Sequence, residues 1–340
     1  MEDVSNCYLV KPSSGSIAIP YFAVSGGTST STSDPFVPVE ATIPEGATCG
    51  LLWTDNSNGL SSSGVVSSVS ISGNNLLVTT GSAEGNAVVY LKNSRGTILW
   101  SWHIWVTDYD PDDGGKTYPY STTGTTFMDR NLGATAVATA INSPLASYGL
   151  YYQWGRKDPF PSANATTINN VSGVTGSAAM YGTETKVTID TQDKSVDMAT
   201  ATENPTTFYT GNSSPYDWNS SPNVNLWGNS TTSIVNSKSP YDPCPVGWRV
   251  PVYKSGVSPW NGLSGSWSTW SSKVGYPPAS GYRGCGNGEF LNVGSSGDCW
   301  AAAPGGNYGC GLHFDSSSVD SSGRYYRARA NGFGVRCCRE

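Results

Sequence analysis

The chain has 340 residues, enough for two domains that each bury a core of their own. Charged residues make up 13% of it, about half the usual share, whereas glycine and aromatic residues are abundant. This excludes a disordered chain, because disordered chains are rich in charge and poor in aromatics, and the net charge of −6 argues against a nucleic-acid partner. Many short strands joined by polar loops fit the composition better.

The cysteines indicate an oxidising compartment. No Cys-x-x-Cys pair occurs and there are only two histidines, so we expect no structural zinc. An even number of cysteines in a loop-rich, lysine-poor chain predicts disulfides, with buried thiols as the alternative. The candidates are Cys7, Cys49, Cys244, Cys285, Cys299, Cys310, Cys337 and Cys338.

The start of the chain and its hydropathy suggest export. No apolar run approaches the roughly 18 residues that span a bilayer. Met1-Glu2-Asp3 stands where a signal peptide is expected, which suggests that an export segment was removed. We therefore expect an exported protein at the cell surface, on the outer membrane or outside the cell.

Residues 1–107 are expected to form an all-β domain, an immunoglobulin-like or transthyretin-like sandwich. Short apolar runs recur between turn clusters, as in sandwiches. In the last run, strict alternation places His103 on the outer face of its strand. The runs are Cys7–Val10, Ile17–Val24, Val37–Ala41, Leu51–Trp53, Val65–Ile71, Leu76–Thr80, Val88–Leu91 and Ile98–Val106.

Residues 108–117 are expected to be an acidic linker. The carboxylates in Asp108–Gly115 do not follow the order of an EF-hand loop, so a solvated hinge accounts for them better than calcium. We expect proteolysis to cut here and to release two fragments that each unfold cooperatively.

Residues 118–340 are expected to form the second domain, with a small helical contribution. Ser143–Trp154 carries apolar residues at helical spacing. Residues 162–240 are a long insertion rich in Asn, Ser and Thr, which should be a loop layer packed by its own aromatic residues. Its anchors would be Tyr216, Trp218 and Trp227.

The sequence gives no sign of a catalytic or metal site, so we expect no enzyme and no cofactor. A Gly-x-Ser-x-Gly elbow is absent, and His313 has no evident carboxylate partner. Glu203-Asn204-Pro205 differs in order and place from a lectin calcium triplet, and we treat it as chance. Paired carboxylates that cleave glycosides meet only in space, so a glycan-active hydrolase stays open as the alternative.

Several motifs in the second half resemble the FISUMP domain. This is a family of cell-surface modules of gram-negative anaerobes, related in fold to C-type lectin-like domains. The likeness covers about residues 118–340, whereas Ser5–Val10 and Trp102–Asp108 more weakly resemble fimbrillin-like surface proteins. The FISUMP motifs are Met128–Ala134, Tyr148–Arg156, Asp242–Pro251, Pro278–Arg283, Leu312-x-Phe314 and Gly332–Cys337.

The resemblance implies a C-type lectin-like fold with Cys244 bonded to Cys337 or Cys338. Adjacent cysteines bridge each other only with strain, so Cys337 and Cys338 should each join a different partner. We expect three bridges within residues 244–338, and Cys7 with Cys49 if those two pair at all.

Together these features suggest an adhesin on the cell surface or on a pilus. The N-terminal domain would contact pilus subunits, and the lectin-like domain would bind a protein or glycan ligand on another cell or surface. A purely structural pilus subunit is a further alternative. Between Trp300 and Arg336 no Lys, Glu, Gln or Met occurs, as expected if a diversity-generating retroelement mutates adenines there, although these residues are scarce throughout the chain.

The expected binding surface lies between Cys299 and Arg329, where loops should gather opposite the chain ends. Trp300, Leu312 and Phe314 are assigned to the core. The other aromatic and polar residues are of the types that binding sites favour. They are Asn307, Tyr308, His313, Asp315, Asp320, Arg324, Tyr325, Tyr326 and Arg327.

Overall fold

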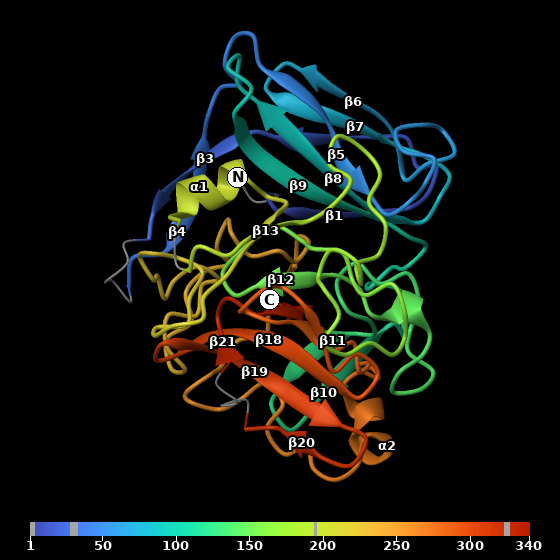
Figure 1. Cartoon of the computed structure of the whole chain (residues 1–340), viewed down its shortest axis with the longest axis vertical. Coiled ribbons are helices and arrows are strands. Elements are labelled where there is room, and N and C mark those ends of the chain that lie inside the picture. Colours follow the sequence, from blue (N-terminus) through green and yellow to red (C-terminus); the bar gives the residue numbers. More distant parts are fainter. Residues whose placement is uncertain (1–3, 28–32, 194–195, 323–326) are drawn as a thin grey trace.

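The computed structural model describes residues 4–27, 33–193, 196–322 and 327–340. The fold is mostly β with few helices, as expected. Figure 1 shows the N-terminal strands at one end of the long axis and the C-terminal strands at the other, with much of the insertion between them.

The N-terminal part holds a strand in each expected apolar run. One sheet has the order β1-β9-β8-β5 and a second has the order β2-β7-β6, while β3 and β4 form a ribbon. Alternating apolar residues turn one face of each strand inward, which is why runs this short suffice. The strands are β1 (Cys7–Val10), β2 (Ser16–Pro20), β3 (Phe22–Gly26), β4 (Phe36–Glu40), β5 (Thr48–Thr54), β6 (Val66–Ser72), β7 (Asn75–Thr80), β8 (Gly85–Lys92) and β9 (Ile98–Val106).

The remaining strands are short and are separated by long loops. Their main sheet has the order β17-β16-β22-β18-β19-β20, with β12 and β21 beside it. The elements are β10 (Thr117–Tyr120), β11 (Thr125–Met128), η1 (Leu145–Ser147), β12 (Tyr151–Gln153), β13 (Thr188–Asp190), α1 (Met198–Glu203), β14 (Thr207–Tyr209), β15 (Trp248–Arg249), α2 (Trp267–Trp270), η2 (Ser271–Lys273), β16 (Tyr282–Arg283), β17 (Phe290–Leu291), β18 (Ser296–Gly305), β19 (Tyr308–Asp315), β20 (Val319–Asp320), β21 (Arg327–Ala328), β22 (Gly332–Gly334) and β23 (Cys338–Arg339).

The helix expected over Ser143–Trp154 is wrong. Only the 3-10 turn η1 forms, and β12 follows it and pairs with β22. Gly149 lies between them with a φ of +70°, and a Cβ there would sit 2.5 Å from the carbonyl oxygen of Leu132. The apolar spacing thus reflects a turn and a buried strand, because pairing with a distant strand outweighs local periodicity.

The hairpin β18–β19 divides two apolar clusters. Trp300 belongs to the cluster that faces the N-terminal part, whereas Leu312 and Phe314 belong to the cluster on the other side. All three are at most 2% exposed, so their assignment to the core is confirmed. The insertion anchors Trp218 and Trp227 are buried as well.

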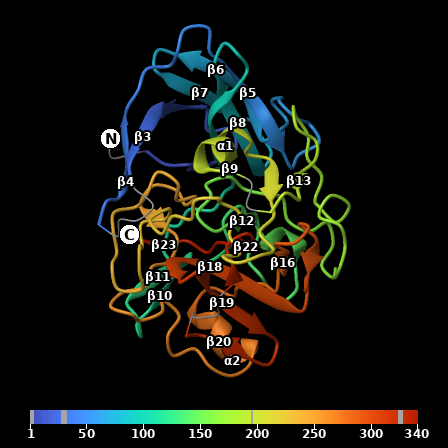
Figure 2. The ribbon, with the colours of Figure 1, turned by 60° about the vertical axis from the view of Figure 1, so that its left-hand side comes forward.

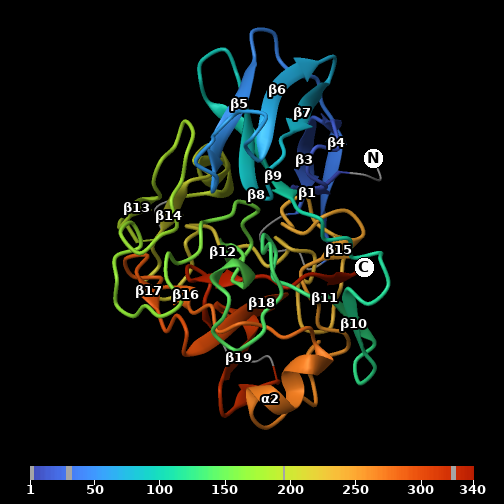
Figure 3. The same cartoon turned by 90° about the vertical axis from the view of Figure 1, so that its right-hand side faces the viewer.

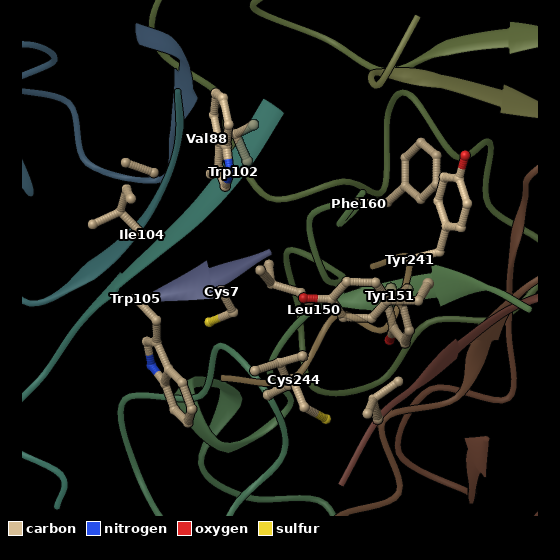
Figure 4. Packing of buried hydrophobic residues seen from close by; sticks show 14 of the residues in the cluster. Cys7, Val88, Trp102, Ile104, Trp105, Leu150, Tyr151, Phe160, Tyr241 and Cys244 are labelled. Atoms are coloured by element: carbon tan, nitrogen blue, oxygen red, sulfur yellow. The ribbon is translucent and has the colours of Figure 1, made fainter. Parts of the chain in front are cut away.

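The last strand of the N-terminal part is buried on both faces. His103 is 2% exposed, so its expected place on an outer face is wrong. Ser101 Oγ donates to Asp158 Oδ1 at 2.6 Å, and Lys157 Nζ donates to Ser101 Oγ at the same distance. Trp105 and Cys7 belong to the same apolar cluster as Leu150 and Cys244 from the second half of the chain (Figure 4). One apolar cluster therefore runs through both parts of the chain.

The acidic segment between the two parts is anchored at Tyr109. This ring is 3% exposed, lies 5.7 Å from the ring of Trp105 and carries the guanidinium of Arg130 at 4.0 Å. Asp112 is exposed and meets Arg339 at 2.7 Å. The division into two independently folding domains stays a prediction, but this segment and β9 tie the two parts together.

Among the described residues there is one disulfide. Cys244 and Cys337 are bonded, and β23 pairs with β11 and β15, so the end of the chain is tied to Phe127 and to residues 244–249. Figure 2 shows β23 beside β11. The expected pair of Cys7 with Cys49 and the two further bridges within residues 244–338 are not formed. Burial raises the pKa of Cys299 and Cys338 to about 12, which keeps both thiols protonated. The cysteines outside the bridge are Cys7, Cys49, Cys285, Cys299, Cys310 and Cys338.

Buried arginines hold the loops where strands are too short to do so. Arg283 donates to the carbonyl oxygens of Pro161 and Gly173 at 3.0 and 2.8 Å. An arginine offers five donors in a rigid fork, so one side chain can satisfy carbonyls of several loops. Arg156, Arg249, Arg329 and Arg336 bond loop carbonyls in the same way.

Candidate functional site

The hairpin β18–β19 carries the candidate binding residues but spreads them along its length. Asn307 is exposed at its turn, and His313 and Asp315 lie toward its other end. Arg327 lies on β21, whose partner on β19 is the stretch Tyr308–Gly309. The candidates Arg324, Tyr325 and Tyr326 lie outside the described residues. The six candidates within the described residues therefore do not form one compact patch.

At the turn of the hairpin the insertion contributes an aromatic ring. Tyr216 stacks on Tyr308 with the ring centroids 5.4 Å apart and the planes at 17°. The carbonyl of Tyr308 accepts from Arg329 Nε at 3.2 Å, and Arg329 is also paired with Asp217 at 3.0 Å. The insertion and the hairpin thus make one continuous surface here.

Two of the candidate carboxylates cap turns. Asp315 Oδ1 accepts from the hydroxyl of Ser317 at 2.7 Å, and the backbone N–H groups of Ser317 and Ser318 donate to it at 2.7 and 2.8 Å. These bonds, the hydroxyl of Ser317 above all, hold the pKa of Asp315 below its usual value. Asp320 Oδ1 accepts from the backbone and hydroxyl of Ser322. Such side-chain bonds define Asx-turns, so both residues have a structural role.

His313 has a carboxylate partner after all. Its Nδ1 lies 2.9 Å from Asp298 Oδ1, because the two residues face each other across β18 and β19. Asp298 is fully buried, and Arg327 Nε lies 3.9 Å from the same oxygen. The expectation that His313 has no evident carboxylate partner is therefore wrong: one buried carboxylate lies beside two basic side chains, those of His313 and Arg327.

Arg327 also lines a hollow of about 520 Å³ next to the triad of Asp298, His313 and Arg327. Its walls come from the insertion, the β16–β17 hairpin and the stretch before β22. Figure 3 shows β16 and β17 below β13 and β14. The lining is mostly polar and includes two glycines. The lining residues are Asn212, Tyr282, Gly284, Cys285, Gly286, Asn287, Glu289, Leu291, Arg327, Ala328 and Asn331.

Hydrogen bonds fix the walls of the hollow. Asn331 Oδ1 accepts from the backbone of Cys285 at 2.8 Å, and Asn212 Nδ2 donates to the carbonyl of Gly286 at 3.3 Å. The backbone of Asn212 donates in turn to Asp193 Oδ1 at 2.5 Å. Burial raises the pKa of the Cys285 thiol, so it lines the hollow as a neutral group. The hollow is therefore preformed.

Sequence reasoning missed Tyr282, Asp298 and Asn212. Tyr282 stands in the motif Pro278–Arg283, where it could have been noticed as an aromatic residue next to a buried arginine. Asp298 is a charge within an otherwise apolar strand, which is itself a signal of function. Asn212 carries no local signal, since only the fold of the insertion brings it to the hollow.

In chemical terms, the hollow offers hydrogen bonds and one aromatic ring. The guanidinium of Arg327 lies 5.7 Å from the centre of the Tyr282 ring, and the centroids of the Tyr282 and Phe333 rings are 5.4 Å apart.

Comparison with protein-family models, with curated proteins and with solved structures returns no match to this chain. None of the helices in the described part has the length and hydropathy needed to cross a bilayer.

Proposed function

We propose that this protein is an exported adhesin of the cell surface or a pilus. Its C-terminal half, which we interpret as a C-type lectin-like domain of the FISUMP kind, binds a protein or glycan ligand through the surface around Arg327. The N-terminal sandwich connects it to a surface assembly. The loops of the binding surface are open to diversification by a retroelement.

The preformed hollow beside the Asp298–His313–Arg327 triad is the observation that supports this proposal. It draws on three loop regions, and apart from the Cys285 thiol it offers hydrogen-bonding groups and an aromatic ring rather than a reactive group. Polar and aromatic loops on a rigid scaffold are typical of binding surfaces. The long apolar cluster behind them supplies that scaffold.

The test compares two double variants in a binding assay with labelled protein on intact cells. Arg327→Gln with Asn287→Ala should reduce binding at least about 10-fold, because hot-spot residues each contribute over 1 kcal/mol. Arg95→Gln with Asn261→Ala removes the same side chains from exposed sites elsewhere and should leave binding unchanged. Equal binding by both variants would move the site away from the hollow.

Among the described residues, the pair Asp298–His313 is the contact that favours a hydrolase as the alternative. A histidine oriented by a buried carboxylate can act as a general base. If the protein were a hydrolase of this kind, the wild type would release reducing ends from one of a panel of polysaccharides and the variant His313→Gln would not. We expect no turnover by either protein, and turnover by the wild type alone would establish the hydrolase.

A further inference from the structure

We propose that three aromatic rings form a second contact surface, which binds an oligosaccharide through the apolar faces of its sugar rings. The rings are those of Tyr118, Trp267 and Tyr276, called the ring row below. None of them lines the hollow beside Arg327, and Figure 3 shows α2 and β10 well apart from β16 and β17. The inference rests on the adhesin function proposed above and names a glycan as its ligand.

Two segments that are far apart in the sequence bring the rings together. Tyr118 lies on β10, which is the edge strand of its sheet and packs against η2. Tyr276 follows η2, and its N–H donates to the carbonyl of Ser271 at 2.9 Å. The ring centroids of Tyr118 and Tyr276 are 6.1 Å apart, with the planes at 90°. Those of Trp267 and Tyr276 are 6.0 Å apart, with the planes at 53°, so the three rings follow one another without a gap.

The ring row is partly open to solvent. All three residues are half-buried, and neither Tyr118 nor Tyr276 belongs to one of the two apolar clusters. Trp267 packs against one of these clusters from outside. In the described part of the chain, the hydroxyl groups of Tyr118 and Tyr276 have no hydrogen-bond partner. Two phenol groups are therefore available to a ligand beside the accessible parts of the rings.

The backbone of Tyr276 indicates a role other than packing. Its φ is +52°, in the left-handed region, where a bulky residue is an outlier and glycine is favoured. Such outliers gather at sites that hold ligands. The ring of Tyr276 enters neither apolar cluster, so burial in the core does not account for a tyrosine at this position.

Side chains hold the backbone on both sides of Tyr276. Arg336 Nη1 donates to the carbonyl of Val274 at 3.3 Å and also to that of Gly275. Trp267 Nε1 donates to the carbonyl of Pro277 at 2.7 Å. Because these bonds fix the turn in advance, its backbone loses little conformational entropy when a ligand binds.

The ring row suits a sugar chain better than a peptide. Aromatic rings stack on the apolar C–H faces of pyranose rings, and phenol groups both donate to and accept from sugar hydroxyls. Peptides bind through side chains that enter pockets, or through prolines that enter grooves lined by aromatic residues. Rings with centroids 6.0 and 6.1 Å apart are in contact and leave no slot between them. An oligosaccharide can lie across such a row.

The test titrates the full-length protein by calorimetry with soluble hexasaccharides of β-linked glucose, xylose, mannose and N-acetylglucosamine. We expect at least one of them to bind, and Tyr276→Gly to bind it at least about 10-fold more weakly, as for the loss of an aromatic hot spot. Glycine accepts a φ of +52°, so this variant removes the ring and keeps the turn.

Lys273→Gln is the matched control, because it changes an exposed side chain of η2 and leaves the rings intact. It should bind the hexasaccharide like the wild type. Loss of binding in Lys273→Gln with full binding in Tyr276→Gly would mean that a charge rather than the ring row holds the ligand, and would overturn the inference.

Tyr118→Thr is the second ring variant, since threonine suits an edge strand. It should also weaken binding at least about 10-fold, whereas Tyr118→Phe should lose only part of the affinity, because it keeps the ring and lacks one hydroxyl. The circular dichroism of each variant must match the wild type. If Tyr276→Gly does not fold, Tyr118→Thr decides, and full affinity in that variant would overturn the ring row.

The cell-binding assay separates this inference from the proposed function. Binding to none of the hexasaccharides would overturn the glycan, and loss of cell binding by Tyr276→Gly would then assign the ring row to a protein ligand. If Arg327→Gln with Asn287→Ala binds cells like the wild type while Tyr276→Gly loses the sugar, the hollow fails and the ring row stands. Loss of cell binding by the double variant and of sugar binding by Tyr276→Gly would support both surfaces.

Discussion

Burial sets the charge state of individual residues in this protein. His103 is 2% exposed, and its Nε2 lies 2.9 Å from Asn86 Oδ1. Burial lowers the pKa of His103 to about 3, so the ring stays neutral in the folded chain. The buried arginines behave differently, because carbonyl oxygens of the loops accept hydrogen bonds from their N–H groups. Burial still lowers the pKa of Arg283 to about 9, which leaves it charged at neutral pH.

His103 should make the fold sensitive to acid. Its pKa is near 6.5 in the unfolded chain and about 3 in the folded one, so only the unfolded chain takes up a proton between these values. Its contribution to the free energy of unfolding is present above pH 6.5 and is lost as the pH falls toward 3, on the order of 5 kcal/mol in all.

Urea unfolding of the wild type and His103→Gln between pH 7 and 4 measures this effect. The variant should lose stability less steeply on acidification. The comparison isolates His103 from Asp55 and Asp242, whose pKa values are raised by burial and which therefore act in the opposite direction. Parallel curves would mean that His103 is accessible to protons in the folded state.

Arg336→Met should show how much one buried arginine stabilises the loops. Arg336 Nη2 donates to Asn131 Oδ1 at 3.0 Å, and its Nη1 donates to the carbonyl of Val274 at 3.3 Å. Methionine leaves these acceptors buried without donors, which should cost about 3 kcal/mol. Arg95→Met, at an exposed turn, is the control and should change the free energy of unfolding by less than about 0.5 kcal/mol. Equal midpoints of the two variants in urea would show that water replaces the arginine.

At the scale of elements, the hairpin β18–β19 owes its place to small residues on one face. Gly309 and Gly311 lie on β19 opposite the rings of Trp154 and Trp300. The rings occupy the space that a side chain at Gly309 would fill, and a Cβ at Gly311 would lie 2.7 Å from the carbonyl oxygen of Cys299. The stacked pair of Trp300 and Phe333, with centroids 4.2 Å apart, then connects the hairpin to β22.

Gly309→Ala should therefore destabilise the protein by about 1–3 kcal/mol. The new Cβ would lie 2.7 Å from both Trp154 Cδ1 and Trp300 Cζ3. Gly114→Ala is the matched control, since nothing lies within 4 Å of its Cβ. Thermal unfolding of the two variants checks this, and equal melting temperatures would mean that the tryptophans can move aside.

At the scale of elements, the disulfide should make the largest single contribution to the free energy of unfolding. Cys244 and Cys337 are 93 residues apart, so the bond removes roughly 4–5 kcal/mol of chain entropy from the unfolded state. Cys244→Ser with Cys337→Ser should lower stability by that order in urea. Alkylation of the unfolded, non-reduced wild type should modify six cysteines, and fewer would reveal a second bridge.

Across the whole molecule, one apolar cluster joins the two parts of the chain. It contains Trp105 and Val106 from β9 together with Leu150 and Trp248 from the C-terminal half. Asn6 Nδ2 donates to the carbonyl of Asp242 at 3.0 Å, and Ser5 Oγ donates to that of Cys244 at 2.8 Å. Contacts of this kind make separate unfolding of the two parts costly.

We therefore expect the full chain to unfold in a single calorimetric transition. A fragment of residues 1–107 would expose Trp105 and the second face of β9, so it should lack a cooperative transition and bind a hydrophobic dye. This reverses the expectation drawn from the acidic segment. Two separate transitions in the full chain, or a cooperative fragment, would restore two independent domains.

The sequence by itself determined the mostly β character, the N-terminal strands, and the burial of Trp300, Leu312 and Phe314. The strands, Leu312 and Phe314 follow from short apolar runs and local alternation, which a strand shows whatever it packs against, and Trp300 follows from its place after a cysteine. It also placed Cys244 with Cys337 among its alternatives, through a motif at each end of a long loop.

Only the tertiary structure shows that the second face of β9 is buried, that the turn before β12 ends at Gly149 and that His313 has a carboxylate partner. Alternation marks one buried face, and it carries no information on whether another part of the chain covers the other. The hollow beside Arg327 belongs to the same class, because its walls come from residues 212, 282–291 and 327–331. Such residues meet through long-range pairing of short strands, which no local pattern in the chain encodes.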